Sequence, residues 1–144
     1  MKIKEFHQQL NESGIVFAIQ EAERKTSGEI RILVSKDKIE DPVLEAQKIF
    51  LREKMDRTAE RNGVLIYIAP LSQKYAVIGD QGITEKVGNQ FWSEVVDSMG
   101  GYFKQADFNQ GVVEAIQKIG ETLAMHFPRR GDDQNELSNT ILKD

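Results

Sequence analysis

Six consecutive apolar residues, Val-Leu-Ile-Tyr-Ile-Ala at positions 64–69, constrain the fold more than any other stretch of this sequence. The run is short for a helix, and its branched and aromatic residues favour an extended strand. A strand without polar residues on either side is typical of the centre of a sheet that is covered on both faces. We therefore predict a central strand here, with helices packed on both faces of its sheet.

Two further strands are predicted beside the central one. Residues 74–79 follow after a short connection, 70–73, and are expected to return as the second arm of an antiparallel hairpin. Residues 29–35, Glu-Ile-Arg-Ile-Leu-Val-Ser, also have the composition of a buried strand, and a helical pattern separates them from the central strand. Because a connection from strand through helix to strand is nearly always a right-handed parallel crossover, the three strands should form a small mixed sheet.

Helical periodicity marks the longer segments of the chain. Apolar residues recur every three or four positions in residues 13–25, 42–59, 84–99 and 107–127. The candidate N-caps are Ser13, Asp41, Thr84 and Asp107, and the candidate stops of the last two helices are Gly100-Gly101 and Pro128. Helices that alternate with strands in this order predict a three-layer α/β/α sandwich with a small mixed sheet.

The chain has 144 residues, which is enough for one ordinary hydrophobic core and too short for two. We expect a single domain over residues 1–128. Residues 129–144 are polar and show no apolar period, so we expect a disordered tail there. The acidic run at 131–136 lacks the alternate spacing and the central glycine of a calcium-binding loop, so we do not interpret it as a metal site.

Composition argues against several classes of function. The formal net charge is −4, so the chain as a whole has no electrostatic attraction to nucleic acid or to an anionic membrane. The absence of cysteine excludes disulfides, thiolate catalysis and cysteine-ligated zinc. The first residues contain charges every few positions and no apolar stretch, so we expect neither a signal peptide nor a membrane anchor. We expect a cytoplasmic monomer.

The predicted topology brings polar residues from three segments to one edge of the sheet. The crossover starts residues 29 and 63 at the same end, and the hairpin returns residue 80 to that end. The residues expected to converge are Glu29, Glu60, Arg61, Asn62, Asp80 and Glu85. Hard divalent cations need several oxygen ligands, and side chains from separate segments can supply them. We therefore predict a metal site formed by Glu29, Glu60, Asn62, Asp80 and Glu85, with calcium as the expected ion and magnesium as the alternative.

Each of these residues also has a purely structural interpretation. Asp80 lies between Gly79 and Gly82, where an aspartate also suits a tight turn and caps the following helix. Glu29 and Glu60 could be solvated or could pair with nearby arginines. Trp92 follows another aromatic residue on a predicted helix, so it could line a groove or be partly buried in the core.

Several motifs in a fixed order carry a family resemblance. They are EAERKTSGEIRILVS, RNGVLIYIAP, YAVIGDQGI, FW, FNQGVVEAI and HFP. In this order they resemble the TPM domain family, which takes its name from thylakoid lumen proteins, a photosystem II repair protein and a modulator of a worm receptor. The resemblance covers roughly residues 5–128.

The resemblance implies an α/β/α sandwich, a divalent-cation pocket that acidic residues form and that usually holds calcium, and, in some plant members, acid phosphatase activity. The residues that match the family's turns are Asn62-Gly63, Gly79 and Gly82, and Asp80 lies within the second turn. Relatives that carry a signal peptide and a membrane anchor have an acidic residue where this chain has Thr84. Since we expect neither segment here, the chain resembles the soluble bacterial branch.

Three hypotheses about function follow. The first is a divalent-cation-binding protein with a binding or regulatory role, in which a protein partner recognises the metal-loaded face. The second is a metal-dependent phosphatase of phosphomonoesters, in which Arg61 binds the phosphoryl oxygens. The third is a protein-interaction module without metal, in which the helix that carries Trp92 is the docking surface.

Overall fold

The computed structural model describes residues 2–129 and 141–144. Within them, a mixed sheet has the strand order β3-β2-β1-β4. The strands are β1 (Glu29–Val34), β2 (Gly63–Ala69), β3 (Lys74–Gly79) and β4 (Leu142–Lys143). β1 and β2 are parallel, and β2 and β3 are antiparallel. The predicted crossover, hairpin and central strand are therefore confirmed.

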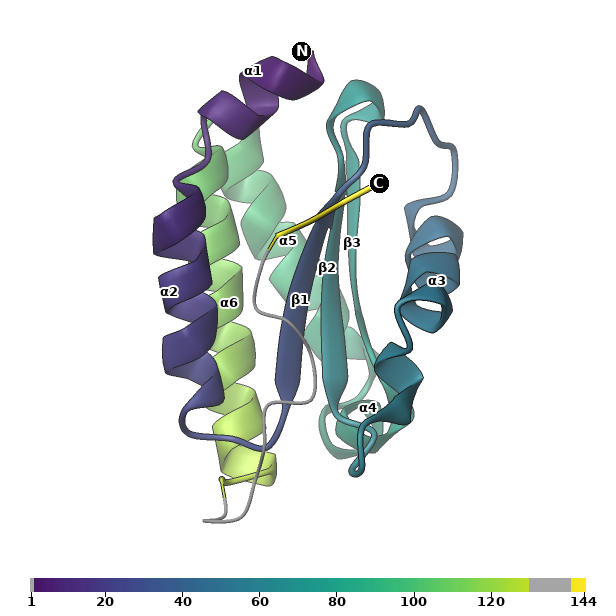
Figure 1. Ribbon diagram of the computed structural model, residues 1–144, viewed down its shortest axis with the longest axis vertical. Helices are drawn as coiled ribbons and strands as arrows, with labels where there is room; N and C mark the ends of the chain where they lie inside the picture. The colour runs from purple at the N-terminus through teal and green to yellow at the C-terminus, as the bar shows by residue number, and fades with distance from the viewer. Residues whose placement is uncertain (1, 130–140) are drawn as a thin grey trace.

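Helices cover both faces of this sheet (Figure 1). One face carries α1 (Ile3–Gln8), α2 (Glu12–Glu23), α5 (Asn89–Lys104) and α6 (Phe108–His126), and the other carries α3 (Pro42–Arg52). α4 (Gln81–Val87) follows β3 at the lower end of the sheet in Figure 1. The predicted three-layer α/β/α sandwich is confirmed. None of the described helices is long and apolar enough to cross a membrane.

The sheet divides the hydrophobic core of the described residues into two clusters, one on each of its faces. Alternate residues of each strand point to opposite faces, so Ile30 and Ile66 enter the core under α2, α5 and α6, while Leu33 and Leu65 enter the core under α3. Every residue of β1 and β2 is buried. The continuous apolar run at 64–69 is thus explained by helices on both of its faces.

The helix predicted over residues 42–59 is shorter in the structure. Asp41 caps α3 as predicted, because its side chain accepts a hydrogen bond from the N–H of Leu44 at 3.1 Å. The helix ends at Arg52, and Lys54 has a left-handed φ of 58°. A short 3-10 turn, η1 (Met55–Arg57), then follows. It places the fully buried Met55 in the core under α3.

The predicted helix over residues 84–99 is two helices. Gly88 lies between α4 and α5 with a φ of +82°, which is unfavourable for any residue other than glycine. Thr84 lies inside α4, so its prediction as an N-cap is wrong. The prediction that Gly100-Gly101 ends a helix is also wrong, because α5 continues through them to Lys104.

The remaining predicted caps have mixed outcomes. Asn11 rather than Ser13 caps α2, since its side-chain oxygen accepts a hydrogen bond from the N–H of Gly14 at 3.1 Å. Asp107 occupies the N-cap position of α6 as predicted, but its side chain makes no capping hydrogen bond.

The prediction of a disordered tail is wrong for the last residues of the chain. Leu142 and Lys143 form β4, which pairs in parallel with β1. Ile141 is buried, and the Asp144 carboxylate accepts hydrogen bonds from the Ser35 hydroxyl at 2.5 Å and the Lys36 N–H at 2.7 Å. Burial of apolar Ile141 and backbone pairing stabilise this strand. The rest of the predicted tail, residues 130–140, lies outside the described residues.

Candidate functional site

The three segments of the predicted site meet at one end of the sheet. Glu29 is the register partner of Gly63, and the backbone N–H of Asp80 donates to the C=O of Gly63 at 2.9 Å. The starts of β1 and β2 and the end of β3 therefore lie together, as the topology predicts. α4 begins directly after Asp80, so its first turn belongs to the same end.

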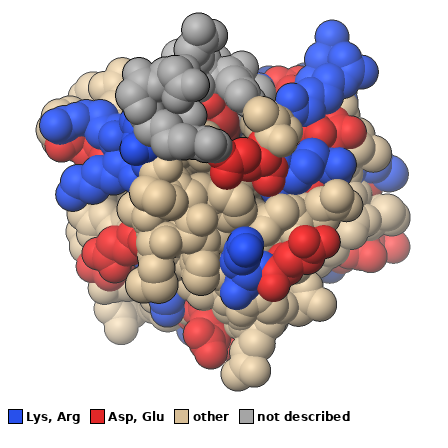
Figure 2. All heavy atoms as spheres, turned by 90° about the horizontal axis from the view of Figure 1, so that it is seen from below, with Lys and Arg blue, Asp and Glu red and all other residues tan. Residues whose placement is uncertain are grey.

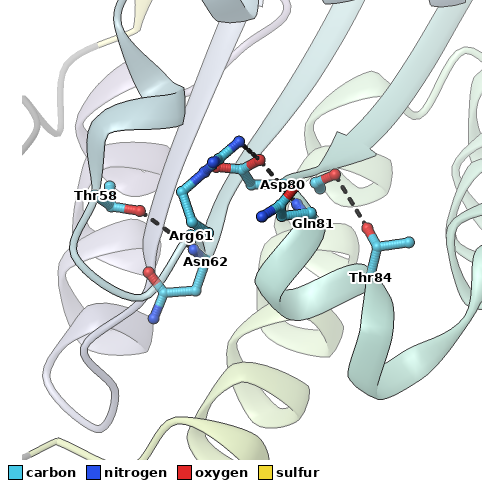
Figure 3. A network of polar contacts seen from close by, with 7 residues as sticks. Thr58, Arg61, Asn62, Asp80, Gln81 and Thr84 are labelled. Atoms are coloured by element: carbon cyan, nitrogen blue, oxygen red, sulfur yellow. Dashed lines mark hydrogen bonds and ion pairs between the residues drawn. The ribbon is translucent and has the colours of Figure 1, made fainter.

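Asp80 makes a two-point ion pair with Arg61 (Figure 3). Arg61 Nε donates to Asp80 Oδ2 at 2.6 Å, and Arg61 Nη2 donates to Asp80 Oδ1 at 2.9 Å. Asp80 Oδ1 also accepts from the backbone N–H of Gln81 at 2.8 Å and so caps α4. The carboxylate is thus held by both its neighbouring helix and a cation, and only 7% of the residue is exposed.

Arg61 lies at the rim of this pair. The hydrogen bonds from its side chain to Asp80 raise the pKa of the guanidinium above its ordinary value. Its side chain remains 40% exposed, while its backbone has a left-handed φ of 52°. A phosphoryl group that bound to Arg61 would therefore compete with Asp80 for the same donors.

Asn62 is buried and serves the local structure. Its side-chain Nδ2 donates to Ser27 Oγ at 3.1 Å, and its backbone N–H donates to Thr58 Oγ1 at 3.2 Å. Its backbone C=O accepts from the N–H of Glu29. These bonds tie the start of β1 to the loop before β2, which is the role that the structure shows for this residue.

Glu29 lies beside a second buried acid, Glu23, at the end of α2. The Glu23 Oε2 accepts a hydrogen bond from the N–H of Ile30 at 2.8 Å, while its Oε1 is buried with no hydrogen-bond partner among the described residues. Burial, above all, and the neighbouring Glu29 raise the pKa of Glu23 to about 9, although the hydrogen bond from Ile30 and the charge of Arg129 oppose the shift. Burial therefore favours the protonated, neutral form of Glu23 in the folded protein.

The two remaining predicted ligands lie on either side of the Asp80 turn. Glu60 is partly exposed in the loop before β2, and Glu85 is exposed on α4. No group of three or more acidic, histidine or cysteine side chains in the described part of the chain is placed to hold a metal ion. The segments therefore converge as predicted, but their carboxylates do not form the predicted cluster, because Asp80 bonds to Arg61 and Glu29 lies beside Glu23.

Charges of both signs are interspersed at this end of the molecule. Figure 2 views the lower end of Figure 1 and shows acidic and basic side chains scattered around an area without charged residues. Neither sign forms a continuous patch on the atoms drawn in colour. Attraction of an ion to this face would therefore depend on individual side chains.

A groove of about 690 Å³ runs along β3 between α3 and α5. We call it the α3–α5 groove. Residues 75–80 form its floor, and the walls and end are formed by Val43, Gln47, Phe50 and Leu51 of α3, Thr84 of α4, and Asn89, Trp92, Ser93, Val96 and Asp97 of α5. Asp80 and Asp97 are the charged residues that line it. Its volume lies within the range of about 300–1,000 Å³ typical of ligand sites.

Trp92 both lines this groove and belongs to the core. The residue is 8% exposed and packs in the core under α5. Its indole Nε1 donates to Thr84 Oγ1 at 3.0 Å, and the Thr84 hydroxyl in turn donates to the C=O of Gly79 at 3.0 Å (Figure 3 shows the second bond). Thr84 thus links α4, α5 and the end of β3.

The α3 wall exposes apolar side chains. Leu51 is 62% exposed and Val43 is 47% exposed, and both line the groove. Neither was singled out from the sequence as a site residue. The available signal was that Leu51 falls outside the stripe of Ala46, Ile49 and Phe50, the residues of α3 that are buried.

Glu23 was also not predicted as a site residue, although its spacing in the sequence contained the necessary signal. It follows Ile15 and Ile19 at intervals of four, and these three residues are the buried ones of α2. A charged residue in the position of the buried stripe indicates a partner or an altered pKa.

Comparisons with known proteins agree with the resemblance found in the sequence. A family model for the TPM domain matches residues 7–122. The NMR structure of the BA42 protein from the psychrophilic bacterium Bizionia argentinensis is similar, with 43% sequence identity, 92% of each chain covered and a TM-score of 0.85. No curated protein matches this sequence.

Proposed function

This chain belongs to the TPM domain family, and on that premise we propose that it is a binding module whose α3–α5 groove holds part of a protein partner. The observation that carries the proposal is a groove that follows the outer strand β3 and has a largely apolar wall on the α3 side. Peptide segments bind in grooves of this kind because apolar side chains fill them and backbone groups set their orientation.

The exposed residues of α3 support this proposal. Val43, Leu44 and Leu51 are large apolar residues on one short helix that remain exposed. Val43 and Leu51 line the groove, whereas Leu44 does not. Exposed apolar residues that share the wall of a groove are typical of interaction sites, because a partner removes them from water.

Random twelve-residue peptides selected by phage display on the immobilised protein would test the proposal. Selected peptides are expected to shift the NMR amide signals of residues 75–80 and 89–97. The variant Leu51→Ser is expected to lower the affinity of the selected peptides roughly tenfold, because an apolar contact of about 1–2 kcal/mol is lost. The matched control Leu44→Ser, also exposed on α3, should leave their affinity unchanged.

Two results would contradict the groove as a binding site. One is that no peptide is enriched, or that the enriched peptides shift signals elsewhere. The other is that Leu51→Ser and Leu44→Ser have equal effects on affinity.

We propose divalent-cation binding near Asp80 as a second candidate. It is favoured by the arrival of Glu29, Asn62 and Asp80 at one end of the sheet. Calcium is the expected ion because these side chains offer oxygen ligands. In this state Asp80 would exchange Arg61 for the cation.

Calcium is therefore expected to shift the NMR signals of residues 79–85, with magnesium and EDTA as comparisons. At a hundredfold excess over the dissociation constant, calcium should add about 2.7 kcal/mol to the free energy of unfolding. Arg61→Gln should raise the calcium affinity by releasing Asp80, and Asp80→Asn should remove it. Unchanged signals and stability in saturating calcium would exclude this site.

Release of p-nitrophenol from p-nitrophenyl phosphate, lost in Asp80→Asn, would instead support a phosphatase.

A further inference from the structure

We propose that β3 accepts an additional strand along its free edge, supplied by an extended peptide with apolar residues at alternate positions and basic residues between them. This inference rests on the proposed function, because it concerns the same groove and specifies the chemistry of the segment that fills it. Such strand addition combines backbone hydrogen bonds, which supply affinity, with side-chain contacts, which supply specificity.

The hydrogen-bond pattern of the hairpin shows which backbone groups of β3 face the groove. The N–H of Asp80 donates to the C=O of Gly63, so this pair is directly bonded. Bonded and non-bonded pairs alternate along antiparallel strands, and the register therefore turns Tyr75, Val77 and Gly79 away from β2. The Thr84 hydroxyl, which lies outside the sheet, donates to the C=O of Gly79 and agrees with this orientation.

The outward groups of Tyr75 and Val77 are therefore open to a partner. In the described part of the chain, the N–H and C=O groups of these two residues make no hydrogen bond. The same holds for the N–H of Gly79. These groups repeat every two residues, which matches the spacing of an added strand. A strand beside residues 75–79 could thus bond to all of them.

The opposite edge of the sheet is occupied by the chain itself. β4 pairs with β1 there, and the Glu23 carboxyl group accepts from the N–H of Ile30 further along the same edge. The parallel pairing of Leu142 and Lys143 with β1 shows that a short segment is sufficient to extend this sheet. Among the strands of residues 2–129 and 141–144, β3 is the outermost on the other side.

The walls of the groove favour a single extended peptide over a second copy of this chain. β3 forms the floor, and α3 and α5 form the walls on either side of it. Strands that pair lie about 4.8 Å apart. A second copy would need to bring its own β3 that close, although its β3 lies between the same two walls, so the helices of the two copies would collide. A segment without flanking helices meets no such obstruction.

Side chains of the two walls define the sequence that fits. Residues of an added strand would point alternately toward α3 and toward α5. The α3 wall offers the apolar Val43, Phe50 and Leu51, so apolar residues suit that side. The α5 wall offers Asp97, which is exposed and makes no ion pair with the described residues. Lysine or arginine therefore suits the positions that face α5.

The probe is a nine-residue peptide with blocked ends, valine at alternate positions, and lysine and threonine between the valines. Its binding is expected to shift the amide signals of Tyr75, Val77 and Gly79 and to slow their exchange with water. A peptide with glutamate in place of lysine should bind at least about tenfold more weakly. In Asp97→Lys this preference for lysine should reverse.

Backbone methylation separates strand addition from other ways of filling the groove. The N–H groups of alternate peptide residues face β3, and the other N–H groups face away from it. Methylation of one alternate set is expected to weaken binding at least about tenfold, whereas methylation of the other set should leave it nearly unchanged. Equal affinities of the two methylated peptides would overturn the proposal.

Val77→Pro supplies the corresponding test on the protein. It removes an N–H that faces the groove and leaves the ladder to β2 intact, which an edge strand tolerates. We expect a folded protein with at least about tenfold weaker peptide binding. A different outcome is that selected peptides bind in the groove and lose affinity in Leu51→Ser, while Val77→Pro and methylation leave their affinity unchanged. In that case strand addition is wrong, but the proposed binding module stands. If no peptide maps to the groove, both proposals are wrong. Should Val77→Pro fail to fold, the methylated peptides decide the question on the unaltered chain.

Discussion

Replacing Glu23 with glutamine is expected to raise the thermal unfolding midpoint at pH 7 and above, and to change it little at pH 4. Glutamine has nearly the same shape and can accept the hydrogen bond that Glu23 Oε2 receives from the N–H of Ile30. It has no proton to lose. The substitution therefore keeps the backbone contact and removes the ionisation.

The direction follows from the pKa of Glu23, which burial and Glu29 raise from 4.5 to about 9 in the folded protein. Below pH 4.5, Glu23 is mostly protonated in both the unfolded and the folded protein, so its ionisation opposes folding very little. As the pH rises from 4.5 toward 9, the unfolded chain releases this proton and the folded protein retains it, so stability declines. At pH 7 the penalty is roughly 3 kcal/mol, at about 1.4 kcal/mol for each pH unit.

Thermal unfolding followed by circular dichroism from pH 4 to pH 9 measures this effect. We expect Glu23→Gln to gain about 10 °C over the unaltered protein at pH 7. Glu21→Gln is the matched control, because Glu21 lies on the same helix but pairs with Arg24 at the surface. It should show no such gain. Parallel pH profiles for Glu23→Gln and the unaltered protein would contradict a buried neutral acid at this position.

Gly82→Ala is expected to lower the free energy of unfolding by roughly 3 kcal/mol or more. A Cβ atom at this position would lie 2.2 Å from the backbone O of Glu60 and 2.6 Å from that of Arg61. Both contacts are with backbone, so no side chain can rotate away. The N–H of Ile83 also donates to the C=O of Arg61 at 3.3 Å and holds α4 against this loop. Relief of the clash would therefore displace the loop or the helix, at a cost at the upper end of that for overpacked sites.

The loss of stability expected for Gly82→Ala is opposite in sign to the effect of helix propensity, which favours alanine over glycine by about 1 kcal/mol. Gly101→Ala is the matched control, because Gly101 lies within α5 and a Cβ there would meet nothing within 4 Å. It should stabilise the protein by up to about 1 kcal/mol. Urea unfolding of both variants provides the comparison. A Gly82→Ala protein as stable as Gly101→Ala would show that α4 is not packed against the loop before β2.

Local sequence patterns were sufficient for the sheet and for the layers around it. The apolar run at 64–69 required cover on both faces, and the short connection at 70–73 required a hairpin. Together with the crossover from residues 29–35, they placed Glu29, Gly63 and Asp80 at one end of the sheet, where the structure has them. These features depend on the alternation of residues along a strand and on chain connectivity, which are both present in the linear sequence.

Partners of individual polar groups were decided only by tertiary structure. From the sequence, Asp80 could be a turn residue, a helix cap or a metal ligand. In the structure, the left-handed turn at Arg61 brings the guanidinium to its carboxylate. Glu23 and Glu29 are separated in the chain and become neighbours because α2 packs on β1. The groove likewise exists because α3 and α5, on opposite faces, leave the outward edge of β3 between them. Such contacts depend on distances between side chains that the sequence leaves far apart, so periodicity alone does not contain them.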